Sequence, residues 1–342
     1  RATPGLLMAS FALLVAVKLP GIGRSINGAR RWLGAGPLQF EPSELMKLAL
    51  VLYAAHVLSS GRMTERRLRA MLRPLLLVTA AACGLVVLQP DLGTAIILIF
   101  VVVTVMVAAG VPLRTLGLLG LGVVGVVLVV ALLEPYRRAR LTAFLDPWAH
   151  AGTSGFQAVQ GQIALGSGGL LGVGPGQSVQ KIFSLPEAHT DFILAVIGEE
   201  LGVLGVCGLL FLYGLVAYAG LRAARAAKGT YAALLAVGIT SLIVGQATLN
   251  VFAVLGLAPL TGVPLPLVSY GSTNMIVMLM AVGLLLNVAR GGTAHLRALG
   301  TPGAKPRRSA GAGNQDRDRG GGDGRARRAG AGGGRRAARA GR

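Results

Sequence analysis

The stretch TLGLLGLGVVGVVLVVALL, residues 115–133, contains no charged side chain and no polar side chain after its first threonine. A helix formed by it is apolar on every face, whereas a helix of a soluble bundle keeps one polar face. A run of about 20 apolar residues is long enough to cross the hydrocarbon core of a membrane as an α-helix. The stretch therefore predicts a membrane-spanning helix and, with it, an integral membrane protein.

Seven more apolar runs have the same character, so we predict eight spans. They are residues 5–19, 44–59, 74–89, 92–110, 113–133, 191–221, 231–257 and 268–289. The composition supports this class, because 13% of the residues are charged, whereas soluble domains carry roughly 25%. We predict an all-α integral membrane protein, a polytopic helical bundle with a long extracytoplasmic loop, residues 134–190, between spans 5 and 6.

The basic residues predict the orientation of the bundle. Basic loops at 60–73 and 222–228 lie on the same side as the basic C-terminal segment if there are eight spans, so that side is the cytoplasm. The segments that then face outward are residues 20–43, 134–190 and 258–267. They also carry Arg and Lys, which either snorkel at helix ends or bind an anionic ligand, and charge alone favours neither interpretation.

The C-terminal segment, residues 290–342, consists mainly of Gly, Ala and Arg, and it carries fourteen Lys or Arg against three Asp. It cannot bury a core, so we predict a disordered cytoplasmic tail after a membrane domain formed by residues 1–289. A basic segment next to a final span is expected to bind anionic lipid. Nucleic-acid binding is the weaker alternative, since Arg and Gly content alone is not specific.

Charged side chains near membrane depth are candidates for function, because an ionised group in hydrocarbon costs a few kcal/mol or more. Glu44 and Lys47 are three residues apart and share one helix face. They form either a rim glutamate paired with a snorkelled lysine or a functional pair. Asp91, in QPDLGT (89–94), is either the N-cap of the following helix or a functional acid.

The stretch SLPEAHTDFILAVIGEELG, residues 184–202, brings acids, a histidine and a threonine to the start of a span. Asp191 lies where this helix is expected to begin, and capping is the simplest role for it. Glu199 and Glu200 lie deeper and need partners within the bundle. The Gly-rich segment 164–181 suits a flexible, partly re-entrant lip. Together these features predict an outward-facing cavity with acids at its floor and cations around it.

Seven motifs, in the same order and with matching spacing, resemble those of the SEDS family (shape, elongation, division and sporulation). They are NGARRWL (27–33), EPSELMKLAL (41–50), QPDLGTA (89–95), EPYRRARLTAFLDPWA (134–149), GFQAVQGQIALGSGGLLGVGPGQSVQK (155–181), LPEAHTDFILAVIGEELG (185–202) and LAPLTGVPLPLVSYG (257–271). Their form is similar to the division and sporulation branch rather than the rod-elongation branch. Family members have ten spans and this resemblance begins at the third, so we expect the first two to be missing. The family's SYGGSS reads SYGSTN here, at residues 269–274.

The resemblance implies a peptidoglycan glycosyltransferase that polymerises lipid II outside the cytoplasmic membrane and releases undecaprenyl pyrophosphate. It places the family's essential aspartate on Asp191, as a general base or as a carboxylate that positions the acceptor hydroxyl or a metal ion. The implied metal is Mg²⁺ or Mn²⁺. The candidate substrate-binding residues are Glu44, Lys47, Arg30, Arg31, Asp91, Arg137, Arg138, Arg140, Lys181, Glu187, His189, Thr190, Ser269 and Tyr270.

The family also implies a setting for the protein. Its partners would be a class B penicillin-binding protein and other divisome membrane proteins, at the division septum of a bacterial cytoplasmic membrane. Two alternatives from other classes are a lipid II flippase and a non-catalytic divisome scaffold. A flippase needs polar groups along its whole path, and the concentration of charge on the outer side favours the polymerase.

Overall fold

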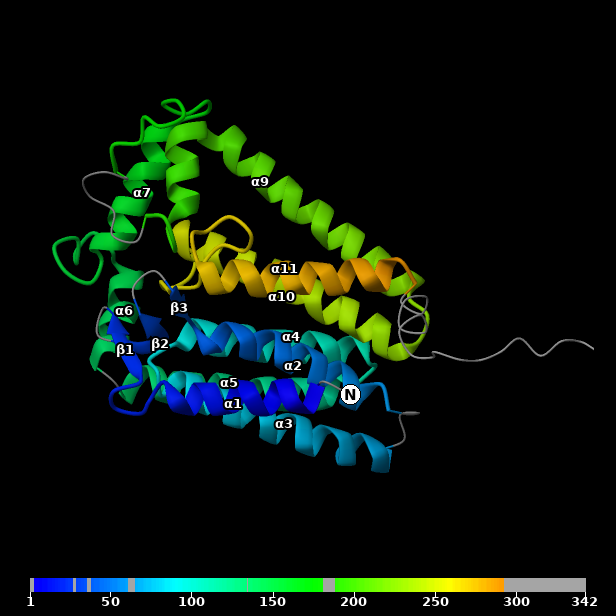
Figure 1. Cartoon of the computed structure of the whole chain (residues 1–342). Coiled ribbons are helices and arrows are strands. Elements are labelled where there is room, and N and C mark those ends of the chain that lie inside the picture. The colour runs from blue at the N-terminus through cyan, green and yellow to red at the C-terminus, as the bar shows by residue number, and fades with distance from the viewer. Residues whose placement is uncertain are drawn as a thin grey trace, which may run out of the picture. The chain divides into compact units, whose positions relative to one another are not determined.

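All eight predicted spans are occupied by helices in the computed structural model, which describes residues 3–26, 29–35, 38–60, 65–133, 135–180 and 188–291 (Figure 1). These residues belong to one compact unit, residues 1–296. The eight helices are α1 (Thr3–Ala16), α2 (Pro42–Leu58), α3 (Glu65–Val87), α4 (Leu92–Ala108), α5 (Leu113–Leu133), α9 (Ile193–Ala226), α10 (Thr230–Val254) and α11 (Ser272–Ala289).

Length and apolar character single out some of these helices as membrane spans. Within the described ranges, four apolar segments are long enough to cross a membrane, namely Ala70–Val87, Ile193–Ala226, Thr230–Val254 and Ser272–Ala289. Three apolar helices are shorter: Thr3–Ala16, Leu92–Ala108 and Leu113–Val127. The class of helical membrane protein is confirmed, while the count of eight crossings stays a prediction.

Helix α10 forms the centre of the bundle and packs against α2, α4, α9 and α11. Its Ile239, Leu242 and Ile243 are completely buried, as are Leu50 of α2 and Leu98 of α4. Helix α5, in contrast, packs mainly against α4 and the following α6 (Pro135–Leu145) and exposes much of its apolar surface. Apolar side chains on such a surface are suited to contact with lipid.

Two segments that we predicted as connections contain regular structure. Three antiparallel strands form a sheet in the order β1 (Gly23–Ile26), β2 (Ala29–Ala35) and β3 (Leu38–Phe40). The long outward segment contains α6 (Pro135–Leu145) and α7 (Phe156–Gly168). Figure 1 shows the sheet and α6 at the same end of the bundle. The predicted loop 60–73 is also partly helical, because α3 begins at Glu65, where Glu, Arg and Leu favour a helix.

The Gly-rich segment after α7 is fastened to α9 and is not a free lip. Val173 N donates to Glu199 O at 2.9 Å, and Val203 N donates to Gly169 O at 3.0 Å. These contacts converge on a kink at Gly202, whose φ of +66° and ψ of −165° are open to glycine but strained for other residues. A Cβ at this position would also lie 2.5 Å from Leu170 O. The kink therefore requires glycine.

Candidate active site

Asp191 lies just before α9 in a segment whose backbone is held by three successive hydrogen bonds. His189 O accepts from Tyr270 N at 2.9 Å. Thr190 O accepts from Ser269 Oγ at 2.5 Å, and Asp191 O accepts from the Asn250 side chain at 2.8 Å. The N-cap of α9 is Phe192, the residue after Asp191. The backbone that carries the Asp191 carboxyl group is therefore fixed at three consecutive carbonyl groups.

The donors to these carbonyls come from α10 and from the loop between α10 and α11, and polar side chains of α10 also hold that loop in place. Asn250 Nδ2 also donates to Val263 O at 2.8 Å, and Gln246 Nε2 donates to Pro264 O at 2.8 Å. Leu265 N donates to Ser269 Oγ at 2.7 Å. Two amides one turn apart on α10 therefore hold consecutive carbonyls of the loop that faces Asp191.

Two glycines allow the close approach of the elements around Asp191. Gly262 has φ +69°, and a Cβ built there would lie 3.4 Å from Asp191 Oδ2. Gly93, in the first turn of α4, packs so closely that a Cβ would lie 2.5 Å from a methyl group of Val263 and 2.8 Å from Thr261 O. The glycine of QPDLGT thus brings α4 against the loop that lines the site.

A cavity of about 30 Å³ opens beside Asp191. Its polar lining comes from five separate segments of the chain and consists of Arg140, Gln157, Asp191, Asn250 and Thr261. Arg140, on α6, is partly buried, and its Nη1 donates to Leu260 O at 3.1 Å. One cavity therefore presents both a carboxyl group and a guanidinium group, the combination needed to polarise a hydroxyl and to stabilise an anion.

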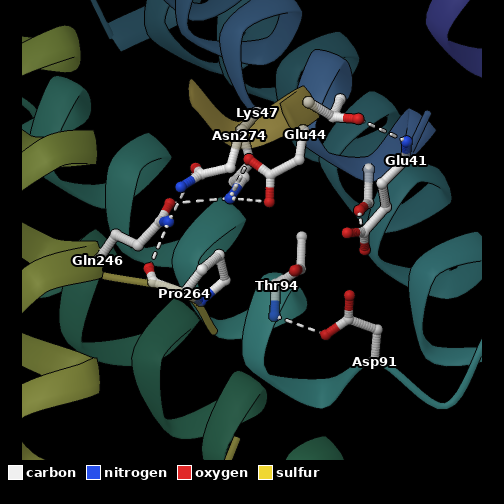
Figure 2. Close-up of polar contacts among 10 residues, drawn as sticks. Glu41, Glu44, Lys47, Asp91, Thr94, Gln246, Pro264 and Asn274 are labelled. Carbon is white, nitrogen blue, oxygen red and sulfur yellow. Dashed lines mark hydrogen bonds and ion pairs between the residues drawn. The ribbon is translucent and has the colours of Figure 1, made fainter. Parts of the chain in front are cut away.

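A second polar cluster lies where α2, α10 and α11 meet (Figure 2). Lys47 Nζ lies 2.8 Å from both carboxylate oxygens of Glu44 and 2.8 Å from Gln246 Oε1. Gln246 Nε2 also donates to Asn274 Oδ1 at 3.2 Å. Glu44 and Lys47 are 2% and 1% exposed, so the alternative of a rim glutamate with a snorkelled lysine is wrong. Gln246 joins this cluster to the loop at Pro264.

Glu41 and Asp91 add two carboxyl groups near this cluster (Figure 2). Burial, together with the nearby negative charges of Glu44 and Asp91, raises the pKa of Glu41 to about 8. Asp91 accepts from Thr94 N at 3.0 Å and is the N-cap of α4, which is one of the two roles considered for it. The other role, as a functional acid, stays a prediction.

The other predicted arginines lie in different surroundings. Arg31 donates through Nε to Gln89 O at 2.8 Å and through Nη2 to Pro90 O, and so fastens β2 to the turn before Asp91. Arg30 is exposed on β2. Arg138 is exposed on α6 and donates to Leu132 O at 3.1 Å. None of these three lines the Asp191 cavity.

The remaining predicted residues differ in how far their side chains are exposed, and some lie outside the described residues. His189 and Tyr270 have exposed side chains, with Tyr270 84% exposed, and Ser269 is completely buried. Thr190 is partly buried beside Asp191. The predicted Lys181, Glu187 and the side chain of Arg137 lie outside the described residues.

Sequence reasoning missed four side chains that shape these sites: Gln246, Asn250, Thr261 and Asn274. The first two are polar residues inside the apolar run of α10, which is a signal for an internal partner or a functional site in a membrane helix.

Glu199, for which we predicted an internal partner, has one. Its carboxylate accepts from Ser178 Oγ at 2.5 Å and from Val179 N at 3.1 Å.

The oxygen atoms around the cavity fit a particular mode of divalent-cation binding. Across the described ranges, no three His, Cys, Asp or Glu side chains gather into a set that could hold a metal ion. The cavity supplies one carboxyl group, from Asp191, together with neutral oxygens. Mg²⁺ commonly uses one or two carboxylates and takes its other ligands from water and from phosphate groups of a substrate. Asp191 therefore fits a cation that a phosphorylated ligand brings with it.

Comparison with known proteins identifies close relatives. The family model for FtsW, RodA and SpoVE, described as cell cycle protein, matches residues 1–293. Stage V sporulation protein E of Bacillus subtilis is 43% identical over 289 residues, which cover 83% of this chain and 78% of that protein. The "Probable peptidoglycan glycosyltransferase FtsW" of Thioalkalivibrio sulfidiphilus is 42% identical over 295 residues, covering 85% of this chain and 74% of that protein.

Solved structures share this arrangement of helices. A chain from a study of how a peptidoglycan synthase complex coordinates polymerization and crosslinking has a TM-score of 0.69 and 36% identity, covering 84% of this chain and 81% of that one. The rod shape determining protein RodA of Thermus thermophilus has a TM-score of 0.61 and 35% identity, covering 84% of this chain and 78% of that one.

Proposed function

The chain belongs to the FtsW, RodA and SpoVE family of cell cycle proteins, the SEDS family, and on that premise we propose that its catalytic centre is the cavity beside Asp191. It is a peptidoglycan glycosyltransferase of the FtsW type, since relatives named for that activity are 40% and 42% identical over most of its length. The observation that supports the location is the hydrogen bonding of three consecutive carbonyl groups, ending at Asp191, beside a cavity that Arg140 also lines.

We propose lipid II as both donor and acceptor. The acceptor sugar's 4-hydroxyl attacks the anomeric carbon of the donor sugar, forming the glycosidic bond while the bond from that carbon to the pyrophosphate oxygen breaks. Asp191 takes the hydroxyl proton, and undecaprenyl pyrophosphate leaves with the bonding electrons. A carboxylate fixed through its own backbone suits this task, because a general base must stay within hydrogen-bond reach of the proton that it removes.

Cationic side chains would stabilise the negative charge that develops on the leaving pyrophosphate. Arg140 is the candidate that lines the cavity, and its bond to Leu260 O fixes one edge of the guanidinium group. Lys47 is committed to Glu44 and Gln246, and we propose that it acts by ordering the loop that carries Thr261. Arg30 and Arg138 remain candidates for binding substrate away from this cavity. Arg31, Arg137 and Lys181 remain predicted substrate-binding residues.

We further propose that a divalent cation, Mg²⁺ or Mn²⁺, accompanies the substrate. Asp191 would supply its protein carboxylate, and the remaining ligands would come from pyrophosphate oxygens and water. Such a cation supplies neutralising charge for the leaving group. The residues of the chain still have to orient the two sugars and to hold the proton at Asp191.

The membrane arrangement that we propose has eight spans in this chain, with the sheet, α6, α7 and the loop before α11 on the outer side. The chain is an integral membrane protein, and its tail is proposed to lie in the cytoplasm against anionic lipid. We propose action at the division septum beside a class B penicillin-binding protein and other divisome proteins. The similarity to a chain from a peptidoglycan synthase complex supports such a partner.

The test is polymerisation of lipid II by the purified protein with its partner penicillin-binding protein, comparing the native chain with Asp191→Asn. This substitution keeps the size of the side chain and the backbone bonds but removes the base. We expect glycan from the native chain and a loss of at least about a hundredfold in the variant, which is the range of a general base.

Two results would contradict the proposal in different ways. Equal product from both proteins would remove Asp191 from the chemistry. Transport of lipid II across vesicles without any glycan would instead support a flippase, and partner recruitment unaffected by Asp191→Asn with no glycan from either protein would support a scaffold.

A further inference from the structure

The side chain of Asn250 uses only one of its two polar atoms within the described structure. Nδ2 donates to Asp191 O and to Val263 O, both at 2.8 Å. Asn250 is only 2% exposed, and its Oδ1 is buried. This oxygen nevertheless has no hydrogen-bond partner among the described residues. The orientation of the amide follows from its contacts, because turning it over would place Oδ1 against two carbonyl oxygens.

Thr261, another residue that lines this cavity, has a second buried oxygen. Its Oγ1 also lacks a partner in the part of the chain that the structure describes. Both residues line the cavity of about 30 Å³ that Asp191 lines. Buried polar atoms are nearly always paired with protein, water or a ligand. A cavity of this volume has room for a water molecule or for one hydroxyl group.

We propose that Asn250 Oδ1 and Thr261 Oγ1 together bind one hydroxyl group of the acceptor sugar, next to the hydroxyl that Asp191 activates. The inference deepens the proposed function and rests on it. A hydroxyl group can donate to the amide oxygen of Asn250 and accept from the hydroxyl of Thr261, so one sugar hydroxyl satisfies both atoms.

The hydroxyl bound here is a neighbour of the nucleophile and not the nucleophile itself. A hydroxyl has a single proton, so the group that donates to Asn250 cannot donate to Asp191 at the same moment. Asn250 also holds Asp191 O, which fixes the spacing between the binding oxygen and the carboxylate. Recognition of one hydroxyl thereby places an adjacent hydroxyl at the base, which is how positioning contributes to catalysis.

Thr261 is the residue to vary, because its hydroxyl holds no other described group in place. Thr261→Val keeps the shape and removes the hydroxyl, and Thr261→Ser keeps the hydroxyl. Thr248→Val is the matched control, since Thr248 lies on the exposed side of α10 with its hydroxyl bonded to Val244 O at 2.8 Å. Substituting Asn250 would disturb Asp191 whether or not the amide binds sugar.

The experiment measures initial rates of polymerisation with the partner penicillin-binding protein, on lipid II and on lipid II whose acceptor sugar lacks the hydroxyl beside the attacking one. On native lipid II, Thr261→Val should lower the rate at limiting substrate roughly tenfold, the effect of one lost hydrogen bond. Thr261→Ser should restore most of that rate, and Thr248→Val should leave it unchanged.

On the deoxygenated substrate, the native protein and Thr261→Val should be equally slow, because the same interaction is already absent. The thermal stability of the substrate-free variant should be unchanged or higher, since an unpaired buried hydroxyl has been removed. Additive losses, or a loss of stability, would overturn the inference and assign Thr261 to water or to structure. Absence of glycan from the native protein on native lipid II would instead overturn the proposed function.

Discussion

Glu44 and Lys47 form an ion pair near the start of α2. Both side chains are almost completely buried. Removing one partner leaves the other as an uncompensated buried charge, which costs about 3–5 kcal/mol in proteins. We expect Lys47→Met to lower the free energy of unfolding by that amount, as measured by chemical unfolding in mixed micelles.

The control for this prediction is the double variant Glu44→Gln and Lys47→Met. It removes both charges, and the new amide can donate to Gln246 Oε1, so most of the lost stability should return. If Lys47→Met alone cost less than about 1 kcal/mol, the pair would be solvated and Glu44 would not depend on Lys47.

The raised pKa of Glu41 predicts a pH dependence of stability. Its carboxyl group is protonated in the folded state up to about pH 8, whereas in the unfolded chain it ionises near 4.5. Between these values the folded state binds more protons, so stability falls as the pH rises from 4.5 to 8 and then levels off. We expect the melting temperature of the native chain in detergent to decrease over this interval.

Glu41→Gln should flatten that part of the curve and melt at a higher temperature than the native chain at pH 8. The amide keeps an oxygen to accept from Ser43 Oγ, which lies 2.8 Å from Glu41 Oε1 in the native chain. Identical pH profiles for the two proteins would mean that Glu41 is ionised in the fold despite Glu44 and Asp91.

At this scale, the sequence supplied candidates but not their contacts. Spacing within one helix was enough to pair Glu44 with Lys47, because residues three apart share a face. The contact of Lys47 with Gln246 joins residues 199 positions apart, and no local pattern encodes it. Asn250 and Thr261 escaped attention for the same reason: their importance comes from the carbonyls and the cavity beside them.

At the scale of elements, the apolar runs predicted the long helices because burial in lipid demands the same composition on every face. The sheet β1–β3 was not predicted, since its strands are three to seven residues long and their pairing depends on contacts between segments. The backbone hydrogen bonds between the Gly-rich segment and α9 were also not predicted. Abundant glycine suggested flexibility, whereas here Gly202 permits a specific kink.

The kink at Gly202 leads to a prediction about the hydrogen bonds that hold the Gly-rich segment on α9. Gly202→Ala forces a side chain into a conformation that costs about 1–3 kcal/mol, and its Cβ would meet the backbone at Leu170 and Gly172. We expect the variant to release residues 169–180 from α9, so that the amides of Val173 and Gly174 exchange hydrogen faster by mass spectrometry. These amides now donate to Glu199 O and Glu200 O.

Gly208→Ala is the matched control in the same helix. A Cβ at Gly208 meets nothing within 4 Å, and alanine there should leave exchange in residues 169–180 unchanged while stabilising the helix by about 0.5–1 kcal/mol. Equal exchange in the Gly202 and Gly208 variants would show that the kink does not hold the segment.

At the scale of the whole molecule, the proposed chemistry requires the Asp191 cavity to face outward. Gly152, between α6 and α7, and Lys228, between α9 and α10, are both exposed, and the helices α7 and α9 lie between them along the chain. If the long helix α9 crosses the membrane and the 13-residue α7 does not, these two positions lie on opposite sides. The basic residues around Lys228 place it in the cytoplasm.

Single cysteines at Gly152 and Lys228 test this orientation in spheroplasts treated with a membrane-impermeant maleimide. The background should lack Cys83 and Cys207, because Cys207 is exposed on α9. We expect Gly152→Cys to be labelled in intact spheroplasts and Lys228→Cys only after lysis. The reverse pattern would place the cavity in the cytoplasm, where the product could not join the cell wall, and labelling of both in intact spheroplasts would show that α9 does not cross the membrane.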